Sequence, residues 1–308
     1  MDAGAGAPAG AGAAGKAKAG EGAPAGAGAA GAPGDLAGAG APAGAGAAGA
    51  GATGLDALIR CTAGAGAAGA GAVGDAAAVY EVLQGPLADA APDVIITQDQ
   101  CDVCAVSLAD VEAAVCDWTG RATRIVSLQP MTLEDVFNDV ERAGAALGLA
   151  ERGSAVAADL RTRAAQLTVE PSGPRPSVAC IEWTDPLMAA GNWVPELVGM
   201  AGGQDVFGTV GEHAPWIAWD DLASADPDVI VFMPCGFGLE RSAEEAHLLM
   251  KKNPGFRNLK AARTGQVYAT DANAYFNRPG PRLVESLDML CAAFNDQPLP
   301  QGIQRLQD

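Results

Sequence analysis

One pattern occurs twice in this sequence, as LADAAPDVII at residues 87–96 and as LASADPDVIV at residues 222–231. In each copy an alanine-rich segment typical of a helix end leads into a Pro-Asp turn, and a run of β-branched residues follows. A run that is apolar on both faces suits a parallel strand covered by helices. The two copies, 135 residues apart, therefore predict two α/β lobes of similar construction.

A long helical segment separates the two copies. After a strand expected at residues 124–128, Thr132 is a good N-cap with acidic residues in the first helical turn. Apolar residues then recur near helical spacing as far as residue 167, interrupted around Gly148 and Gly153. We expect residues 131–169 to link the lobes, as one long helix with an interruption or as two helices in series.

Helices and strands alternate beyond this segment, which is typical of a parallel sheet with right-handed crossovers. The strands are expected at residues 177–182, 228–233 and 266–270, and the helices at residues 194–201, 220–225, 243–251 and 281–294. The predicted domains are an N-terminal lobe at residues 54–130, the linking helix, and a C-terminal lobe at residues 170–308.

The first 53 residues differ in kind from the rest. Of the first 50, 39 are Ala or Gly, and the unit APAGAGAAG occurs three times. Such a stretch buries too little apolar area to offset its backbone entropy, so we expect a disordered arm at residues 1–53. It has neither the basic start nor the Leu-rich run of a secretory signal, so the sequence leaves the compartment open.

The charge balance excludes one class of partner. The formal net charge is −18, and the arm carries only −1 of it, which leaves −17 on the rest of the chain. A body this acidic repels phosphate backbones, so nucleic-acid binding is not expected. No run of 18 large apolar residues is present, so no membrane span is expected.

Seven cysteines are scattered through the sequence, and only Cys101 and Cys104 form a close pair. A zinc site would need further ligands at suitable spacing, and the only histidines, His213 and His247, lie far from this pair, so no metal site is expected. The pair follows a strand-like run, as thioredoxin-like CxxC motifs do, so thiol-redox chemistry is an alternative. The simpler interpretation places two small side chains at the edge of a cleft.

The aromatic side chains cluster just after predicted strands or in the following loops: Trp183, Trp193, Trp216, Tyr275 and Phe276. Ligands of open α/β sheets bind at the carboxyl ends of the strands, so this placement predicts an apolar cleft for a large flat ligand. The GxSxG, P-loop and HExxH motifs are absent, and no nucleophile has a partnered base. We therefore expect a binding protein rather than an enzyme.

Five segments together resemble the cobalamin/iron-siderophore class of ABC-transporter substrate-binding proteins, and are most similar to its cobalamin-binding branch. They are PDVIITQDQCDVCAVS (92–107), RIVSLQP (124–130), GNWVPELVGMAGG (191–203), DLASADPDVIVFMPCGF (221–237) and NAYFNRPGPRLV (273–284). The resemblance implies a class III periplasmic binding protein-like fold, with two Rossmann-like lobes of parallel sheet joined by a long rigid helix. It also implies a monomer that holds its ligand between the lobes and delivers it to a membrane permease, in the periplasm or at the cell surface.

This chain departs from the family pattern in its N-terminal lobe. The Gly/Ala tract stands where family members have their first strand–helix–strand unit, so that lobe is incomplete. Family members dock on the permease through one carboxylate per lobe. The matching position in the C-terminal lobe is Asp220 or Asp221, and in the N-terminal lobe it falls near Gly85, with Glu81 the nearest acid.

The charge of the cleft segments favours one ligand class. Ferric siderophores are often anionic and favour several Arg or Lys donors, and the cleft segments supply only Arg278 and Arg282. Aromatic walls with neutral amide partners suit an amide-fringed corrin ring, so we expect a non-covalently bound cobalamin-type ligand with Trp216 and Tyr275 as main contacts. The amide partners are Asn192, Asn273 and Asn277. The alternatives are a ferric-siderophore binder, a remnant without ligand, and a thiol-redox protein using Cys101 and Cys104.

Overall fold

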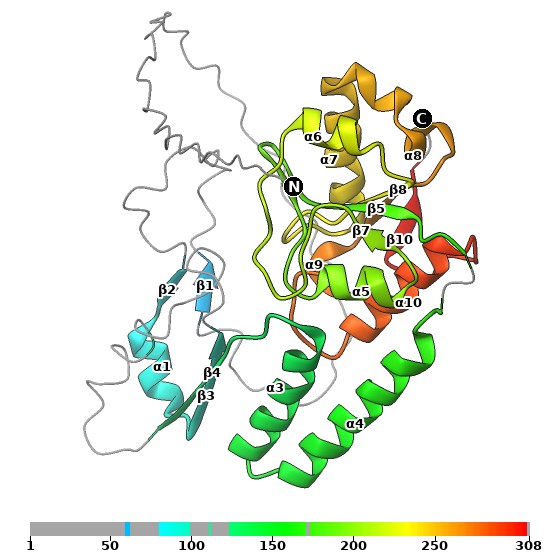
Figure 1. Ribbon diagram of the computed structural model, residues 1–308. Helices are drawn as coiled ribbons and strands as arrows, with labels where there is room; N and C mark the ends of the chain where they lie inside the picture. Colours follow the sequence, from blue (N-terminus) through cyan, green and yellow to red (C-terminus); the bar gives the residue numbers. More distant parts are fainter. Residues whose placement is uncertain (1–58, 62–79, 99–110, 112–122, 171–172, 307–308) are drawn as a thin grey trace, which may run out of the picture. The chain divides into compact units, whose positions relative to one another are not determined.

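The computed structural model describes residues 59–61, 80–98, 111, 123–170 and 173–306 (Figure 1). The predicted arm at residues 1–53 and the Cys101–Cys104 pair lie outside these ranges.

The N-terminal elements form two small sheets. The first is an antiparallel pair of strands, β1 (Ile59–Cys61) and β2 (Tyr80–Val82). The second is a parallel pair, β3 (Val94–Gln98) and β4 (Arg124–Leu128), in which Val94 is opposite Arg124. The helix α1 (Gln84–Ala90) immediately precedes β3.

The repeated sequence pattern forms the same local structure in both copies. In the first copy Ala91 is the C-cap of α1, and β3 follows. In the second copy Asp226 is the C-cap of α6 (Trp219–Ala225), and strand β8 (Val229–Phe232) follows. Both C-cap residues adopt the left-handed conformation, with φ of 41° at Ala91 and 40° at Asp226. The predicted helix end, Pro-Asp turn and strand are confirmed in both places.

Of the two alternatives for residues 131–169, the structure has two successive helices, α3 (Leu133–Ala146) and α4 (Ala150–Leu167), which form a hairpin. Gly148 interrupts the helix with a φ of 73°, which favours glycine. The helices pack so closely that a Cβ on Gly144 would lie 2.8 Å from the Cα of Gly153. Arg161 of α4 reaches back to Glu134 of α3, where its Nη2 and Oε1 are 2.7 Å apart. The hairpin thus corrects the expectation of a single rigid helix.

The C-terminal part is built on one six-stranded sheet with the order β10-β9-β8-β5-β6, in which β7 also pairs with β5. The remaining strands are β5 (Ser177–Thr184), β6 (Leu187–Ala189), β7 (Gln204–Asp205), β9 (Val267–Thr270) and β10 (Ile303–Arg305). The strands β7, β5, β8 and β9 are parallel, whereas β6 and β10 pair antiparallel at the margins. The sheet is therefore mixed, which corrects the expectation of a purely parallel one.

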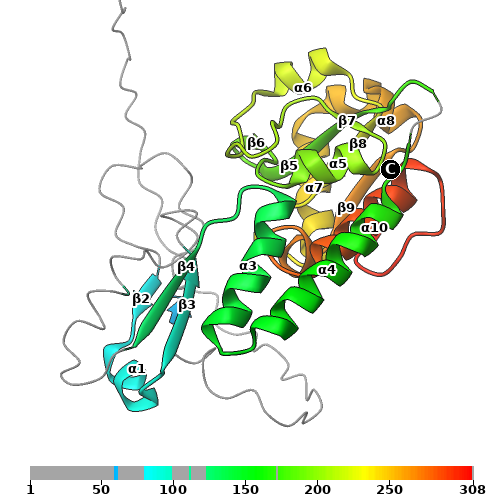
Figure 2. The same ribbon diagram turned by 60° about the horizontal axis from the view of Figure 1, so that its bottom comes forward.

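Helices cover both faces of this sheet, because its strands alternate apolar residues between two cores (Figures 1 and 2). On β5, Val178 and Cys180 face one core, and Ala179 and Ile181 face the other. The first core also contains residues of α3, α4, α5 (Val194–Met200) and α10 (Leu283–Phe294). The second contains residues of α6, α7 (Leu239–Lys252), the 3-10 helix η2 (Pro254–Asn258) and α8 (Lys260–Arg263).

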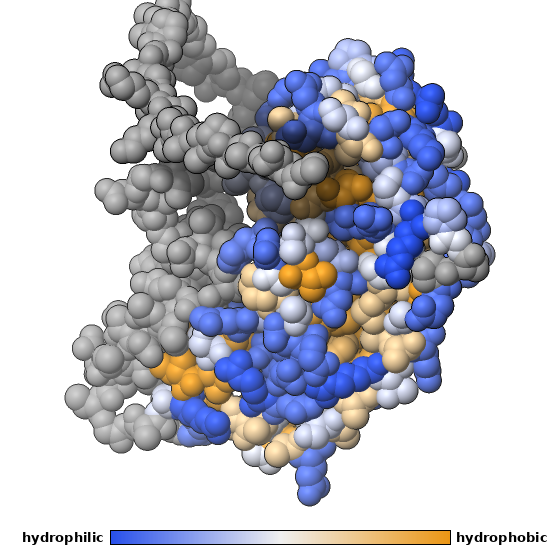
Figure 3. All heavy atoms as spheres, in the orientation of Figure 1, coloured by the Kyte–Doolittle hydropathy of each residue, from blue (hydrophilic) through white to orange (hydrophobic). Residues whose placement is uncertain are grey.

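On the face shown in Figure 3, hydrophilic residues predominate and apolar residues lie in separate patches. Within the described ranges, no helix is both long and apolar enough to cross a membrane.

Candidate functional site: the carboxyl edge of the C-terminal sheet

Three side chains form an apolar row across one end of the sheet. Trp183, next to last in β5, is in register with Met188 of β6, and Met188 forms a bridge with Trp216. Residues directly opposite one another on antiparallel strands project from the same face, so the three share one face. Two strand spacings make the row about 10 Å wide. We name Trp183, Met188 and Trp216 the aromatic row.

The row is partly exposed, since Trp183 and Met188 are half-buried and Trp216 is exposed. Trp216 is 58% exposed, although large apolar side chains are mostly covered in this part of the chain. Its neighbours hold it against β6, since the Ile217 N–H donates to the Leu187 carbonyl at 3.0 Å. The indole N–H of Trp183 donates to the Asp185 carbonyl at 3.1 Å, which sets the orientation of that ring. An exposed, oriented apolar surface of this kind suits a flat ligand.

The loop after β8 extends this surface along the sheet edge. The ring of Phe237 lies 5.6 Å from that of Trp183, centroid to centroid, at an interplanar angle of 42°. The guanidinium of Arg241 lies over the ring of Phe237, 5.4 Å from its centroid. The Cys235 N–H donates to the Glu182 carbonyl at 3.0 Å, which ties the loop to β5.

The loop after β9, together with the short helix α9 (Ala272–Tyr275), completes the edge with polar groups. The Asn273 N–H donates to the Phe237 carbonyl at 3.0 Å, and the Gly236 N–H donates to Oδ1 of Asn277 at 3.2 Å. The exposed Arg278 donates from Nη2 to Oδ1 of Asn273 at 3.0 Å. Aromatic, amide and guanidinium groups that follow β5, β8 and β9 thus gather at this edge of the sheet.

A shallow pocket of about 340 Å³ opens beside this loop. It is lined by Asn273, Ala274, Arg278, Gly280, Pro281 and Arg282. The guanidinium of Arg282 lies 3.9 Å above the ring centroid of Tyr275, so it covers a face of that ring. Tyr275 is only 8% exposed, and a ligand would meet Arg282 before this ring.

Two other predicted ligand contacts are core residues in this structure. Trp193 is 3% exposed and Phe276 is 1% exposed. The indole N–H of Trp193 donates to the Phe276 carbonyl at 2.9 Å, and this buried bond joins the start of α5 to the segment after α9. These residues therefore support the edge from beneath. Trp183, Trp216 and Arg278 are the predicted contacts that the structure leaves accessible.

Asn192, predicted as an amide partner, lies in a tight turn. Its backbone has a φ of 55°, and its N–H donates to the Glu212 carbonyl at 2.6 Å. A Cβ on the preceding Gly191 would meet the backbone of Ala214 at 2.4 Å, so the two chain segments are in close contact. Asn192 therefore joins two loops, whereas Asn273 and Asn277 belong to the sheet edge.

Asp205 has a strongly perturbed carboxyl group. Burial raises its pKa to about 6, and the hydrogen bonds that it accepts from the Phe207 and Gly208 N–H groups act in the opposite direction. Its second oxygen, Oδ2, is buried with no hydrogen-bond partner. The other oxygen, Oδ1, accepts both of these N–H groups and so stabilises the turn after β7. We therefore assign Asp205 a structural role.

The carboxylates predicted to dock on a permease lie in the first turn of α6. Asp221 Oδ2 accepts the Ala218 N–H at 2.8 Å and so caps the helix. Asp220 is exposed and forms no ion pair with any residue that the structure describes. Asp220 is thus the more available carboxylate of the two.

Groups of three or more His, Cys, Asp or Glu side chains suited to a metal ion do not occur among the described residues. Burial raises the pKa of the Cys180 and Cys291 thiols, to about 11 at Cys291, which disfavours the reactive thiolate.

A sequence profile described as "Periplasmic binding protein" matches residues 86–274, more than half of the chain. The chain belongs to the periplasmic binding protein family. This is a family of binding proteins rather than enzymes, so the absence of a catalytic motif from the sequence agrees with the family.

Known relatives and solved structures resemble this chain at low sequence identity. A cobalamin-binding protein of Halobacterium salinarum is 32% identical over 98 residues, 31% of this chain and 26% of that protein. A vitamin B12-binding protein of Vibrio cholerae is 24% identical over 170 residues, 54% of this chain and 58% of that protein. This periplasmic binding protein thus spans only part of the length of either relative.

The structure of a periplasmic heme-binding protein from Pseudomonas aeruginosa covers 74% of this chain and 78% of its own, at 22% identity with a TM-score of 0.55. At this identity the likeness concerns the fold, which is mixed α/β and resembles the class III periplasmic binding proteins.

Two residues of the sheet edge, Phe237 and Met188, were not predicted from the sequence. Phe237 follows the predicted strand at residues 228–233, so the rule that selected Trp183 would also have selected it. Met188 has no comparable signal, because its place in the aromatic row depends on the pairing of β5 with β6.

Proposed function

We propose that this periplasmic binding protein holds a cobalamin-type corrinoid in a cleft between two lobes and delivers it to an ABC-transporter permease. The aromatic row is the observation that carries the proposal. It presents a partly exposed apolar face about 10 Å wide, two strand spacings across, and Asn273 and Asn277 lie along the same edge. A corrin ring is flat and apolar over its faces and carries amide arms at its margin, so it can use both kinds of group.

Charge supports a corrinoid over an anionic ferric siderophore. Arg278 and Arg282 are the cations that line the edge pocket, and both are already engaged, Arg278 with the Asn273 oxygens and Arg282 with the Tyr275 ring. An anionic chelate needs several unengaged donors to offset its desolvation. The halobacterial and Vibrio relatives are a cobalamin-binding and a vitamin B12-binding protein, which supports the same ligand class here.

The lobe architecture is part of this proposal. Residues 54–130 would form an incomplete N-terminal lobe, residues 131–169 the connection, and residues 170–308 the C-terminal lobe. The matching helix ends at Ala91 and Asp226 support two lobes of similar construction. Strand β5 follows α4 in the chain and pairs with β6, β7 and β8 of the C-terminal sheet, which supports the position of the boundary.

Docking on the permease would use the first turn of α6. Asp220 is exposed and lacks an ion-pair partner in the part of the chain that is described, so it has a charge to offer to a basic surface. We assign the contact to Asp220 and the helix-capping role to Asp221, because Asp221 already accepts the Ala218 N–H.

Equilibrium titrations of the full chain with cyanocobalamin, hemin and a ferric siderophore, side by side, test the proposal. The quenching of intrinsic tryptophan fluorescence reports binding near Trp183 and Trp216. We expect saturable binding that is tightest for cyanocobalamin. Tighter binding of hemin or of the siderophore would reassign the ligand, and no binding of any of the three would contradict the function.

An insulin-reduction assay tests the thiol-redox alternative. Under the binding proposal the wild-type protein and Cys101→Ser are equally inactive. Disulfide reduction that disappears in Cys101→Ser would favour the alternative instead.

A further inference from the structure

A basic segment interrupts this acidic chain. Residues 246–270 contain no Asp or Glu, although the chain has 37 acidic residues. The same segment carries six of the chain's basic or histidine side chains, namely His247, Lys251, Lys252, Arg257, Lys260 and Arg263. The segment therefore concentrates positive charge where the rest of the molecule is negative.

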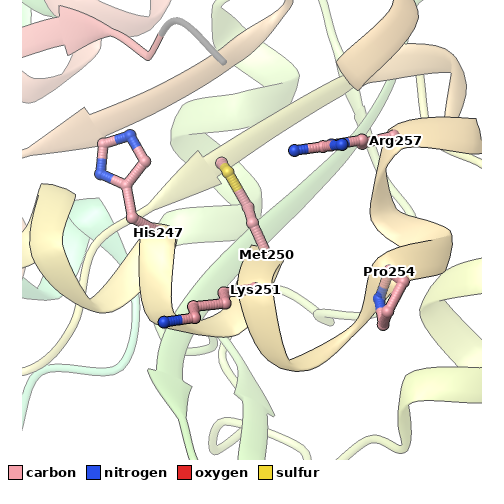
Figure 4. A pocket seen from close by; sticks show the side chains of 5 residues that line it. All are labelled: His247, Met250, Lys251, Pro254 and Arg257. Atoms are coloured by element: carbon pink, nitrogen blue, oxygen red, sulfur yellow. The ribbon is translucent and has the colours of Figure 1, made fainter.

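Part of this segment forms a pocket of about 360 Å³ between the end of α7 and η2. Its lining residues are His247, Met250, Lys251, Pro254 and Arg257 (Figure 4). In this view the guanidinium of Arg257 extends toward the thioether of Met250, and the imidazole of His247 lies on the other side of Met250. The elements α7 and η2 thus contribute both cationic and apolar side chains to the lining.

The frame of the pocket is rigid. Asn253 joins the two elements, because its N–H donates to the Leu249 carbonyl at 3.0 Å and its own carbonyl accepts the Phe256 N–H at 2.8 Å. Phe256 is 1% exposed and packs against Phe232 of β8, with ring centroids 6.4 Å apart. The backbone that carries the pocket is therefore anchored on the sheet core.

The charges that line the pocket are not neutralised by neighbours. Lys252 pairs with Asp185 at 2.8 Å, and Lys260 pairs with Asp228, but neither lysine lines the pocket. Among the described residues, no acidic side chain forms an ion pair with Lys251 or Arg257. Among the described residues, Lys251 and Arg257 thus keep their positive charge without an ion-pair partner.

The helix dipole explains only part of this arrangement. Lys251 and Lys252 lie in the last turn of α7, where a cation is favourable. Arg257 lies beyond that helix, in η2, and the dipole of α7 gives no reason for it to share a pocket with Lys251.

We propose that this pocket binds an anionic phosphate group attached to a small organic group. The guanidinium of Arg257 suits two phosphate oxygens at once, and Lys251 and His247 supply further donors. Met250 and Pro254 offer apolar contact to the attached organic group. Both a soluble organic phosphate and a phospholipid headgroup carry this chemistry.

Calorimetric titration with glycerol 3-phosphate and sedimentation with vesicles of phosphatidylglycerol or phosphatidylcholine distinguish the two sources. We expect binding to at least one phosphate probe and none to phosphatidylcholine vesicles. Soluble binding assigns the site to an organic phosphate, and binding only to phosphatidylglycerol vesicles assigns it to a headgroup. Lys251→Gln and Arg257→Gln should each weaken binding about tenfold, as the loss of one charged hydrogen bond does.

Arg263→Gln is the matched control, because Arg263 is an exposed cation of the same segment that does not line the pocket. It should bind as the wild type does. Binding that falls equally in Arg263→Gln, or that survives in both pocket variants, would overturn the proposal, as would the absence of binding to every probe. Corrinoid titration of the same variants should be unchanged, so the two proposals fail independently.

Discussion

Replacing Gly144 with alanine tests the close packing of the α3–α4 hairpin. A Cβ at this position would lie 2.8 Å from the Cα of Gly153, 3.2 Å from its nitrogen and 3.2 Å from the Leu149 carbonyl oxygen. All three are backbone atoms, so no side-chain rotation relieves the overlap and the helices must separate. Overpacking of this kind costs about 1–3 kcal/mol, and the better helix propensity of alanine returns up to about 1 kcal/mol. We expect a net loss of about 1–2 kcal/mol.

Urea denaturation followed by circular dichroism measures this loss. Gly199→Ala is the matched control, because Gly199 also lies in a helix, α5, and a Cβ there meets nothing within 4 Å. The control should be neutral or up to about 1 kcal/mol more stable than the wild type. A Gly144→Ala protein as stable as the control would refute the close approach of the two helices.

Three other substitutions probe buried polar groups. Burial raises the pKa of Asp205 to about 6, so near pH 5 the folded state holds a proton that the unfolded state has released. The contribution of this group to stability should therefore fall by about 2 kcal/mol as the pH rises from about 4 to 6. Denaturation curves of the wild type and of Asp205→Asn across that range measure it, and the variant should lack this contribution. Trp193→Phe leaves the buried Phe276 carbonyl without its donor, so we expect a loss of about 2–3 kcal/mol in urea denaturation, and an unchanged midpoint would contradict this bond. Glu196 Oε2 accepts the Leu133 N–H at 2.8 Å from the start of α3, so Glu196→Ala should cost about 1 kcal/mol by the same method, and no loss would show that the contact is not formed.

Local signals in the sequence predicted local structure well. The two copies of the repeated pattern form the same helix end, turn and strand, because the left-handed C-cap and the following proline are set within a few residues. Local patterns of the same kind also predicted the alternation of strands and helices after residue 170. The antiparallel strands β6 and β10 were missed, because β6 is three residues long and β10 pairs with a strand far away in the sequence.

Features that depend on tertiary contacts could not be predicted from the sequence. The apolar spacing of residues 131–169 fits one helix or two, and only the packing of Gly144 against Gly153 shows the hairpin. Trp193 and Trp216 occupy similar loop contexts, yet one is 3% and the other 58% exposed. Their difference arises from partners distant in the sequence, the Phe276 carbonyl for Trp193 and β6 for Trp216.

Titration of the full chain with cyanocobalamin, in the wild type and in Trp216→Ala, tests most directly whether the aromatic row holds the ligand. Truncating a central aromatic contact costs about 2–4 kcal/mol, so Trp216→Ala should weaken binding at least about thirtyfold. Leu248→Ala removes a similarly exposed apolar side chain, 55% against 58%, that is not part of the aromatic row, and it should bind as the wild type does. Wild-type affinity in Trp216→Ala would contradict the placement of the corrinoid on this edge.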